Sequence, residues 1–263
     1  MTLQNNEQPP ARPLEPHPAA IVVGASTGMG AALVKDLAKR GYHVAALARR
    51  EEKLDELATR IKSNLSIQTK VVTRVHDVTD YAAIPQLFAE LTDELGGLDL
   101  IVYAAGVMPD VAADEYDFEK DRQQVEINLL GAMAWLNLAA RRFQITKNGT
   151  IIGIGSVAGD RGRKGNPAYH TTKGALAIYL ESLRNRLAEH NVQVTTIKPG
   201  FVDTVMLEGV EKTFWVISPE KAAGLILNAA EKKRQVAYVP FQWRFLMLII
   251  QHFPSFIFRK LSV

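Results

Sequence analysis

Residues 19–30 read AAIVVGASTGMG, an apolar run that passes directly into a glycine-rich turn. The helix-period segment AALVKDLAKRG follows at residues 31–41. A short run of Ala, Ile and Val is typical of a strand that is covered on both faces of its sheet. A strand, a glycine-rich turn and a helix in this order predict the first unit of an α/β fold whose turn approaches an anionic ligand.

The alternation of short apolar runs and longer amphipathic segments continues to residue 239. The further strand-like runs are rich in Val, Ile and Ala: HVAALA at 43–48, TKVVTRV at 69–75, LDLIVYAAG at 98–106, GTIIGIGS at 149–156, VQVTTIKPG at 192–200 and VAYVP at 236–240. We therefore predict a single α/β domain of the Rossmann type, a doubly wound parallel sheet of about seven strands with helices on both faces. Such sheets bind ligands at the carboxyl ends of their strands.

Length and composition narrow the prediction further. The 263 residues suit one large domain, and a net charge of +3 without long Lys/Arg runs argues against a nucleic-acid partner. Cysteine is absent, which excludes disulfides and thiolate metal ligands, and we predict no metal site. Residues 1–18 hold five of the twelve prolines and no apolar signal segment, so we predict a disordered leader and a cytoplasmic protein. The catalytic domain is then expected over 19–239, with an extension over 240–263.

The glycine-rich turn has the spacing G-x-x-x-G-x-G. Glycine lets the backbone turn tightly and approach a pyrophosphate, whose charge is favoured at a helix N-terminus. A turn with packing duties alone is the alternative, and the position between first strand and first helix favours nucleotide binding. The predicted cofactor contacts in this turn are Gly24, Ser26, Thr27, Gly28, Met29 and Gly30.

The end of the second strand indicates which nicotinamide cofactor is bound. NAD-binding folds usually place an acidic residue there for the ribose 2′-hydroxyl, whereas an Arg accommodates a 2′-phosphate. This sequence has Ala48 at that point, followed by Arg49. We predict NADP(H), with Arg49 as the phosphate ligand and Arg50 as the start of a solvated helix.

The third strand ends in His76-Asp77-Val78-Thr79. Asp77 has two interpretations of equal weight, an N-cap for the next helix or a contact to the adenine edge. Asp80 is the better N-cap by position, which leaves Asp77 and Val78 as predicted cofactor contacts.

Four polar residues form the candidate catalytic set. Tyr169 and Lys173 are four residues apart and lie on one face of a helix, where a neighbouring ammonium favours the phenolate. A phenol of lowered pKa is a usable general acid or base. Ser156 follows a strand and can hydrogen-bond the same reacting oxygen, and Asn128 is expected to open a helix.

In these motifs the sequence resembles the short-chain dehydrogenase/reductase family over about residues 19–239. The matching segments are GASTGMG, HDVTD, NLLG, GSVAG, YHTTK and KPGFVDT. The resemblance implies that Tyr169 is the general acid/base, Lys173 holds the nicotinamide ribose, Ser156 orients the substrate oxygen and Asn128 supports a proton relay. It also implies cofactor contacts at Ala105, Gly106, Pro199, Gly200, Val202 and Thr204.

Two segments depart from the family pattern. The usual N-A-G after the fourth strand is replaced by Ala104-Ala105-Gly106, and GIGS stands where the family often has a second Ser before Ser156. Neither change removes a catalytic group, so the expected reaction class is unchanged.

The function that follows is an NADP(H)-dependent oxidoreductase that reversibly reduces a carbonyl to an alcohol. One alternative is a non-catalytic NADP-binding regulator or scaffold on the same fold, against which the complete four-residue set argues. A sugar-nucleotide epimerase also shares YxxxK, but the turn spacing, the modest length and the lack of a separate substrate domain argue against it.

The extension is apolar almost throughout, with eleven large apolar or aromatic residues from Trp243 to Phe258 and cations at Arg244, Arg259 and Lys260. It is too short and too interrupted for a membrane span of about 20 residues. Three locations suit such an extension: a lid on the substrate cleft, an interface between subunits, or a membrane surface. We expect the protein to be a homo-oligomer. A lid or a membrane contact favours an apolar substrate.

Overall fold

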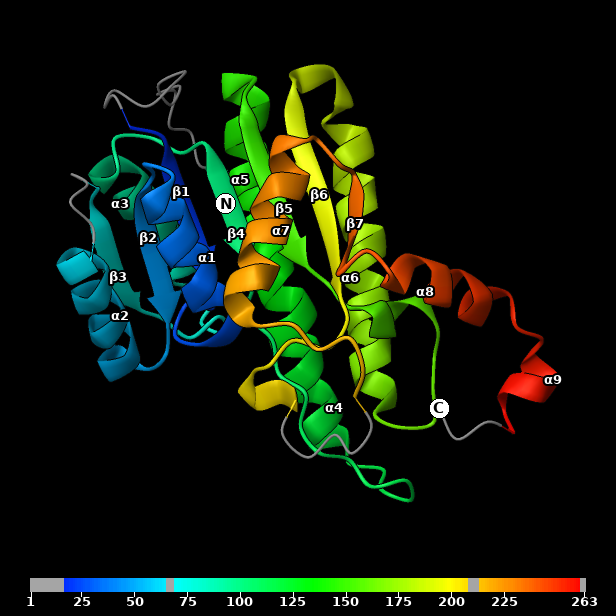
Figure 1. Cartoon of the computed structure of the whole chain (residues 1–263). Helices are drawn as coiled ribbons and strands as arrows, with labels where there is room; N and C mark the ends of the chain where they lie inside the picture. Colours follow the sequence, from blue (N-terminus) through cyan, green and yellow to red (C-terminus); the bar gives the residue numbers. More distant parts are fainter. Residues whose placement is uncertain (1–16, 65–68, 208–212, 261–263) are drawn as a thin grey trace.

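The computed structural model describes residues 17–64, 69–207 and 213–260. The predicted leader therefore lies almost entirely outside the described residues. Within them, seven strands form one parallel sheet in the order β3-β2-β1-β4-β5-β6-β7 (Figure 1), which confirms the predicted fold class. The strands are β1 (Ala19–Val23), β2 (His43–Ala48), β3 (Val71–Val75), β4 (Leu100–Tyr103), β5 (Gly149–Ile154), β6 (Val192–Pro199) and β7 (Val236–Val239).

Helices connect the strands and follow the last one. They are α1 (Gly28–Lys39), α2 (Glu51–Asn64), α3 (Ile84–Glu94), α4 (Phe118–Val125), α5 (Gly131–Thr146), α6 (Pro167–Arg186), α7 (Pro219–Glu231), α8 (Trp243–His252) and α9 (Ser255–Phe258). A π-helical turn joins α4 to α5 at Glu126–Leu130, and a 3-10 turn follows β5 at Val157–Asp160.

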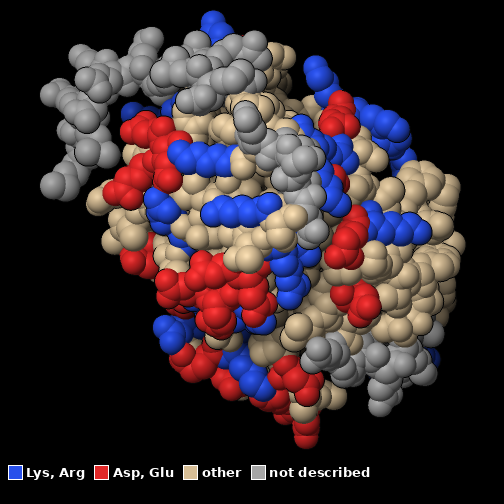
Figure 2. Space-filling view, turned by 60° about the vertical axis from the view of Figure 1, so that its left-hand side comes forward, with Lys and Arg blue, Asp and Glu red and all other residues tan. Residues whose placement is uncertain are grey.

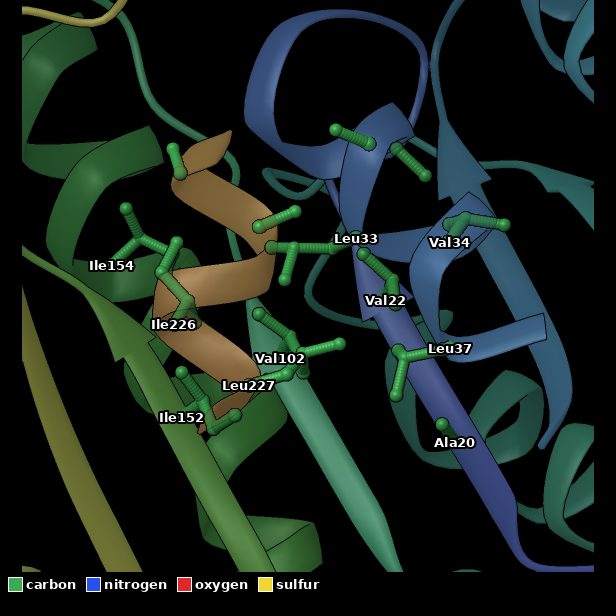
Figure 3. Close-up of a cluster of buried hydrophobic side chains, with 14 of the residues drawn as sticks. Ala20, Val22, Leu33, Val34, Leu37, Val102, Ile152, Ile154, Ile226 and Leu227 are labelled. Carbon is green, nitrogen blue, oxygen red and sulfur yellow. The ribbon is translucent and has the colours of Figure 1, made fainter. Parts of the chain in front are cut away.

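Alternating strand residues build two cores, one on each face of the sheet. Ala20 and Val22 of β1 pack on α1, α2 and α7 (Figure 3), whereas Ile21 and Val23 pack on α3, α5 and α6. Both sets are fully buried, which explains why the strand is apolar at every position and does not alternate.

The strand order reverses between β1 and β4. Chain order runs outward from β1 to β3 on one side and from β4 to β7 on the other. A crevice therefore opens beyond the carboxyl ends of β1 and β4, where doubly wound sheets bind their ligands.

The surface and the helices give two further observations. On the face shown in Figure 2, Lys and Arg side chains are interspersed with groups of Asp and Glu. None of the helices in the described part of the chain is long and apolar enough to cross a membrane.

Candidate active site

A cleft of about 860 Å³ lies at the carboxyl ends of the central strands. This volume is within the range of about 300–1,000 Å³ that small-molecule and cofactor sites occupy. Most of the predicted cofactor contacts line it: Gly24, Ser26, Thr27, Gly28, Met29, Gly30, Arg49, Asp77, Val78, Ala105, Gly106 and Thr204.

The glycine turn needs its glycines at two close approaches. A Cβ on Gly24, whose φ is +91°, would lie 2.3 Å from the Ala105 nitrogen. A Cβ on Gly30 would lie 2.0 Å from the Gly24 carbonyl oxygen. Backbone hydrogen bonds from Gly24 and Ala25 to the Leu47 carbonyl, 2.8 and 2.9 Å long, fix the turn to the end of β2.

The start of α1 is open to a ligand. The helix begins at Gly28, and within the described chain the side chain of its N-cap residue, Thr27, makes no capping hydrogen bond. The first backbone N–H groups of a helix lack partners within it, and they favour an anion. The cleft volume, the glycine cradle and this helix end therefore fit the pyrophosphate of a dinucleotide cofactor.

Two arginines follow β2 at the rim of the cleft. Arg50 donates hydrogen bonds of 2.9 Å to the side-chain oxygens of Ser26 and Thr27. Arg49 lies 3.6 Å from the Asp77 carboxylate. Arg50 is exposed and directly precedes α2, as predicted for the start of a solvated helix, but its guanidinium also reaches back across the glycine turn. Both arginines directly follow Ala48, the last residue of β2, where NAD-binding folds usually have an acidic residue.

Asp77 forms a local turn after β3 and also faces the cleft. Its Oδ1 accepts hydrogen bonds from the backbone and hydroxyl of Thr79 at 3.0 and 2.8 Å. Partial burial would raise the pKa of Asp77, but these hydrogen bonds and the charge of Arg49 hold it below the ordinary value. The predicted N-cap role of Asp80 is wrong, since α3 begins after Ala83 and Asp80 instead accepts from the Ala83 nitrogen.

Asn128 is fully buried in the π-helical turn between α4 and α5, not at the start of a helix. Its side chain pairs with both backbone groups of Val107, at 2.7 and 3.0 Å, and donates to the Thr172 hydroxyl at 3.2 Å. Extra residues of this kind inside a helix often mark functional sites. The turn fixes Asn128 between the loop after β4 and the helix that carries Tyr169.

The structure brings the four candidate catalytic residues together. Lys173 Nζ lies 5.7 Å from the Tyr169 ring centroid and donates to the Ile154 carbonyl at 3.1 Å. A Cβ on Gly106 would lie 3.3 Å from both Asn128 Oδ1 and Lys173 Nζ. Gly106 and its neighbour Val107 line the cleft, so the set lies next to this part of its wall, although none of the four is itself among the described residues that line it.

Burial dominates the titration of the Tyr/Lys pair. It raises the pKa of Tyr169, and a hydrogen bond with the Ser156 hydroxyl offsets part of this rise. It lowers the pKa of Lys173 to about 8. The expectation that the ammonium favours the phenolate is therefore wrong for this structure, because Lys173 is directed to the Ile154 carbonyl.

Of the four residues that the family resemblance implies at the nicotinamide end, one lines the cleft and three do not. Thr204 lines the cleft, and its Cγ2 would lie 3.0 Å from a Cβ on Gly28. Pro199, Gly200 and Val202 do not appear among the described residues that line it. Gly200 contacts the extension instead, since a Cβ there would lie 1.9 Å from the Trp243 indole nitrogen.

Three further residues lie beside the site. The buried Tyr103 hydroxyl donates to the Ile127 carbonyl at 2.6 Å, which ties β4 to the π-helical turn. Thr172 bonds Asn128, and the Met206 sulfur lies 3.8 Å from the Tyr169 hydroxyl. Met206 belongs to the apolar segment after Thr204, which the sequence predicts beside the cleft. Thr172 had a signal in its place beside Lys173 in the YHTTK motif, whereas Tyr103 had none.

The described residues contain no group of three or more His, Cys, Asp or Glu side chains that could hold a metal ion.

A sequence model of the family described as short chain dehydrogenase matches residues 18–214. The chain belongs to this family. It is an oxidoreductase, and its family uses a nicotinamide cofactor and small-molecule substrates.

Relatives cover most of the chain. An uncharacterized oxidoreductase from Mycobacterium tuberculosis is 28% identical over 244 residues, which are 92% of this chain and 96% of the relative. Carbonyl reductase family member 4 from Xenopus tropicalis is 32% identical over 191 residues, 73% of this chain and 78% of the relative. A variant of actinorhodin polyketide ketoreductase, solved with NADPH, has the same fold, with 23% identity, a TM-score of 0.76 and coverage of 85% of this chain and 95% of that one.

Proposed function

We propose that this protein is an NADP(H)-dependent oxidoreductase that reversibly reduces a carbonyl group to an alcohol. The observation that carries the proposal is the grouping of the buried Tyr169, Lys173 and Asn128 with the partly buried Ser156, next to the glycine-lined cleft. A regulator that only bound the nucleotide would need the cleft but not this set.

NADP is favoured over NAD by the residues at the end of β2. Ala48 provides no carboxylate to repel a 2′-phosphate, and Arg49 and Arg50 line the same part of the cleft. Guanidinium groups bind phosphate oxygens through strong charge-assisted hydrogen bonds. The ketoreductase of similar fold was solved with NADPH, which agrees with this choice.

Different groups of residues would bind the different parts of the cofactor. The glycine turn and the start of α1 would bind the pyrophosphate, and Asp77 with Val78 the adenine side. Lys173, Tyr169, Ala105, Gly106 and Thr204 would hold the nicotinamide end. When bound, the nicotinamide supplies or accepts the hydride.

Proton transfer is assigned to Tyr169. In the direction of reduction its hydroxyl donates a proton to the carbonyl oxygen, and in the reverse direction it accepts one from the alcohol. Ser156, whose hydroxyl partly offsets the rise in the pKa of Tyr169, orients the same oxygen. Lys173, on the same helix as Tyr169, and Asn128, in the π-helical turn, connect this point to the backbone groups of Ile154 and Val107.

The substrate side of the site is apolar. Val205 and Met206 line the cleft, and Met206 lies against the Tyr169 hydroxyl. The exposed aromatic residues Phe214 and Trp215 follow on the same segment. These side chains favour an apolar carbonyl compound.

The test is consumption of NADPH by the full-length protein over a panel of aldehydes, ketones, ketoacyl thioesters, steroids and quinones. We expect turnover with an apolar member of the panel and faster turnover with NADPH than with NADH. Tight NADPH binding without turnover on any carbonyl would instead indicate the regulator or scaffold.

A further inference from the structure

The two C-terminal helices extend away from the sheet beyond β7 (Figure 1). Six large apolar residues of α8, α9 and the two positions before α8 are exposed to between 38% and 64%: Phe241, Phe245, Leu248, Ile249, Phe256 and Ile257. Burial of each such side chain is worth about 1.5–3 kcal/mol, so a surface of this kind is normally covered.

The opposite side of the same segment is fixed to the domain. Trp243 and Met247 are buried and pack with Val157 and Phe201. Arg161 donates to the carbonyl groups at the end of α8, and its guanidinium lies 3.9 Å from the Phe258 ring centroid. The outward apolar face is therefore presented in one orientation and is not the face that joins the core.

The charge of this segment has one sign. Residues 241–260 contain no Asp or Glu, whereas Arg244, Arg259 and Lys260 are all cationic and exposed. An apolar helix face flanked by cations matches the boundary of a bilayer with anionic headgroups, which attract each nearby Lys or Arg.

We propose that α8 and α9 form a docking face for an anionic membrane surface, with their apolar side chains in the interface and their cations at the headgroups. A two-fold contact between copies would place this cationic patch against itself, which disfavours a second copy as the occupant. A lid is also disfavoured, because the described residues that line the cleft include none from 241–260.

The test is flotation of the full-length protein with phosphatidylcholine vesicles, with and without phosphatidylglycerol, at low and high salt. We expect binding to the anionic vesicles that weakens in high salt. Leu248→Ser combined with Ile249→Ser should lower binding at least about 10-fold. Arg259→Gln combined with Lys260→Gln should lower it about 25-fold, since each charge contributes about fivefold.

Val75→Ser is the matched control, because Val75 is 54% exposed on the opposite edge strand, close to the 56% of Leu248. The control should bind vesicles like the wild type, and NADPH binding should show that every variant is folded. Failure of the wild type to bind anionic vesicles would overturn the proposal. So would a Leu248/Ile249 variant that dissociates an oligomer in sedimentation while vesicle binding stays unchanged. None of these readouts depends on turnover.

Discussion

At the residue scale, Lys173 is the member of the catalytic set whose pKa burial shifts far from its ordinary value. Its ammonium is almost completely buried, with the Ile154 carbonyl as a hydrogen-bond acceptor. Burial lowers its pKa from 10.5 to about 8. Near neutral pH the folded protein therefore holds a buried charge beside Tyr169, which lowers the free energy of unfolding. Strongly perturbed groups of this kind are typical of catalytic sites.

This shift predicts a dependence of stability on pH. Between about pH 8 and pH 10.5 the folded state holds fewer protons at Lys173 than the unfolded chain does, so the free energy of unfolding rises with pH. The rise is about 3 kcal/mol in total. Urea unfolding at about pH 7 and about pH 10 should show most of it when the wild type is compared with Lys173→Met, which lacks this titration. A difference between the two proteins that does not change with pH would show that Lys173 has an ordinary pKa.

Arg49 and Arg50 carry the prediction for cofactor choice. Replacing either with Ala removes a charged donor, which should raise the Kd for NADPH about 10- to 100-fold and leave the Kd for NADH nearly unchanged. Fluorescence titration of both cofactors measures this, with Lys62→Ala on the exposed side of α2 as the control. A wild type that prefers NADH would contradict the assignment.

Local spacing predicted the catalytic residues but not all of their contacts. The i, i+4 separation of Tyr169 and Lys173 defines one helix face, and the structure brings Ser156 and Asn128 to it. The contact of Met206 with Tyr169 and the reach of Arg50 to Ser26 depend on loops and long side chains. Such contacts leave no period in the sequence.

The unit β1–turn–α1 decides the site at the element scale. The turn approaches the backbone of Ala104 and Ala105 so closely that any side chain on Gly24 would overlap it. The 3-10 turn after Ser156 is fixed by contacts of its last residue, Asp160, with β6 and β7. There the nearly buried Asp160 accepts from Lys198 of β6 and from the Tyr238 hydroxyl of β7.

Gly24→Ala tests the rigidity of this unit. The new Cβ meets backbone atoms, and the φ of +91° is strained for any L side chain, so we expect a loss of about 3 kcal/mol or more in urea unfolding. NADPH binding should weaken as well. Gly162→Ala is the control, because a Cβ there meets nothing within 4 Å and stability should change by less than about 0.5 kcal/mol. Equal effects of the two changes would refute the close approach.

At the scale of the whole molecule, the parallel sheet and its two covered faces were predictable from the apolar runs. Completely buried strands such as β1 can lie only between two layers of helices. The position of residues 241–260 was not predictable, because an apolar segment suits a lid on the cleft, a subunit interface or a membrane surface. The buried Trp243 against Gly200 and the hydrogen bonds of Arg161 decide its orientation.

The central claim is that the cleft and the catalytic set next to it form one active site in which Tyr169 transfers the proton. The most direct measurement compares NADPH binding and carbonyl turnover in the wild type and in Tyr169→Phe, with the best substrate of the carbonyl panel. We predict an unchanged Kd for NADPH and a turnover number lowered about 10²- to 10⁴-fold. Turnover by Tyr169→Phe at the wild-type rate would contradict the account.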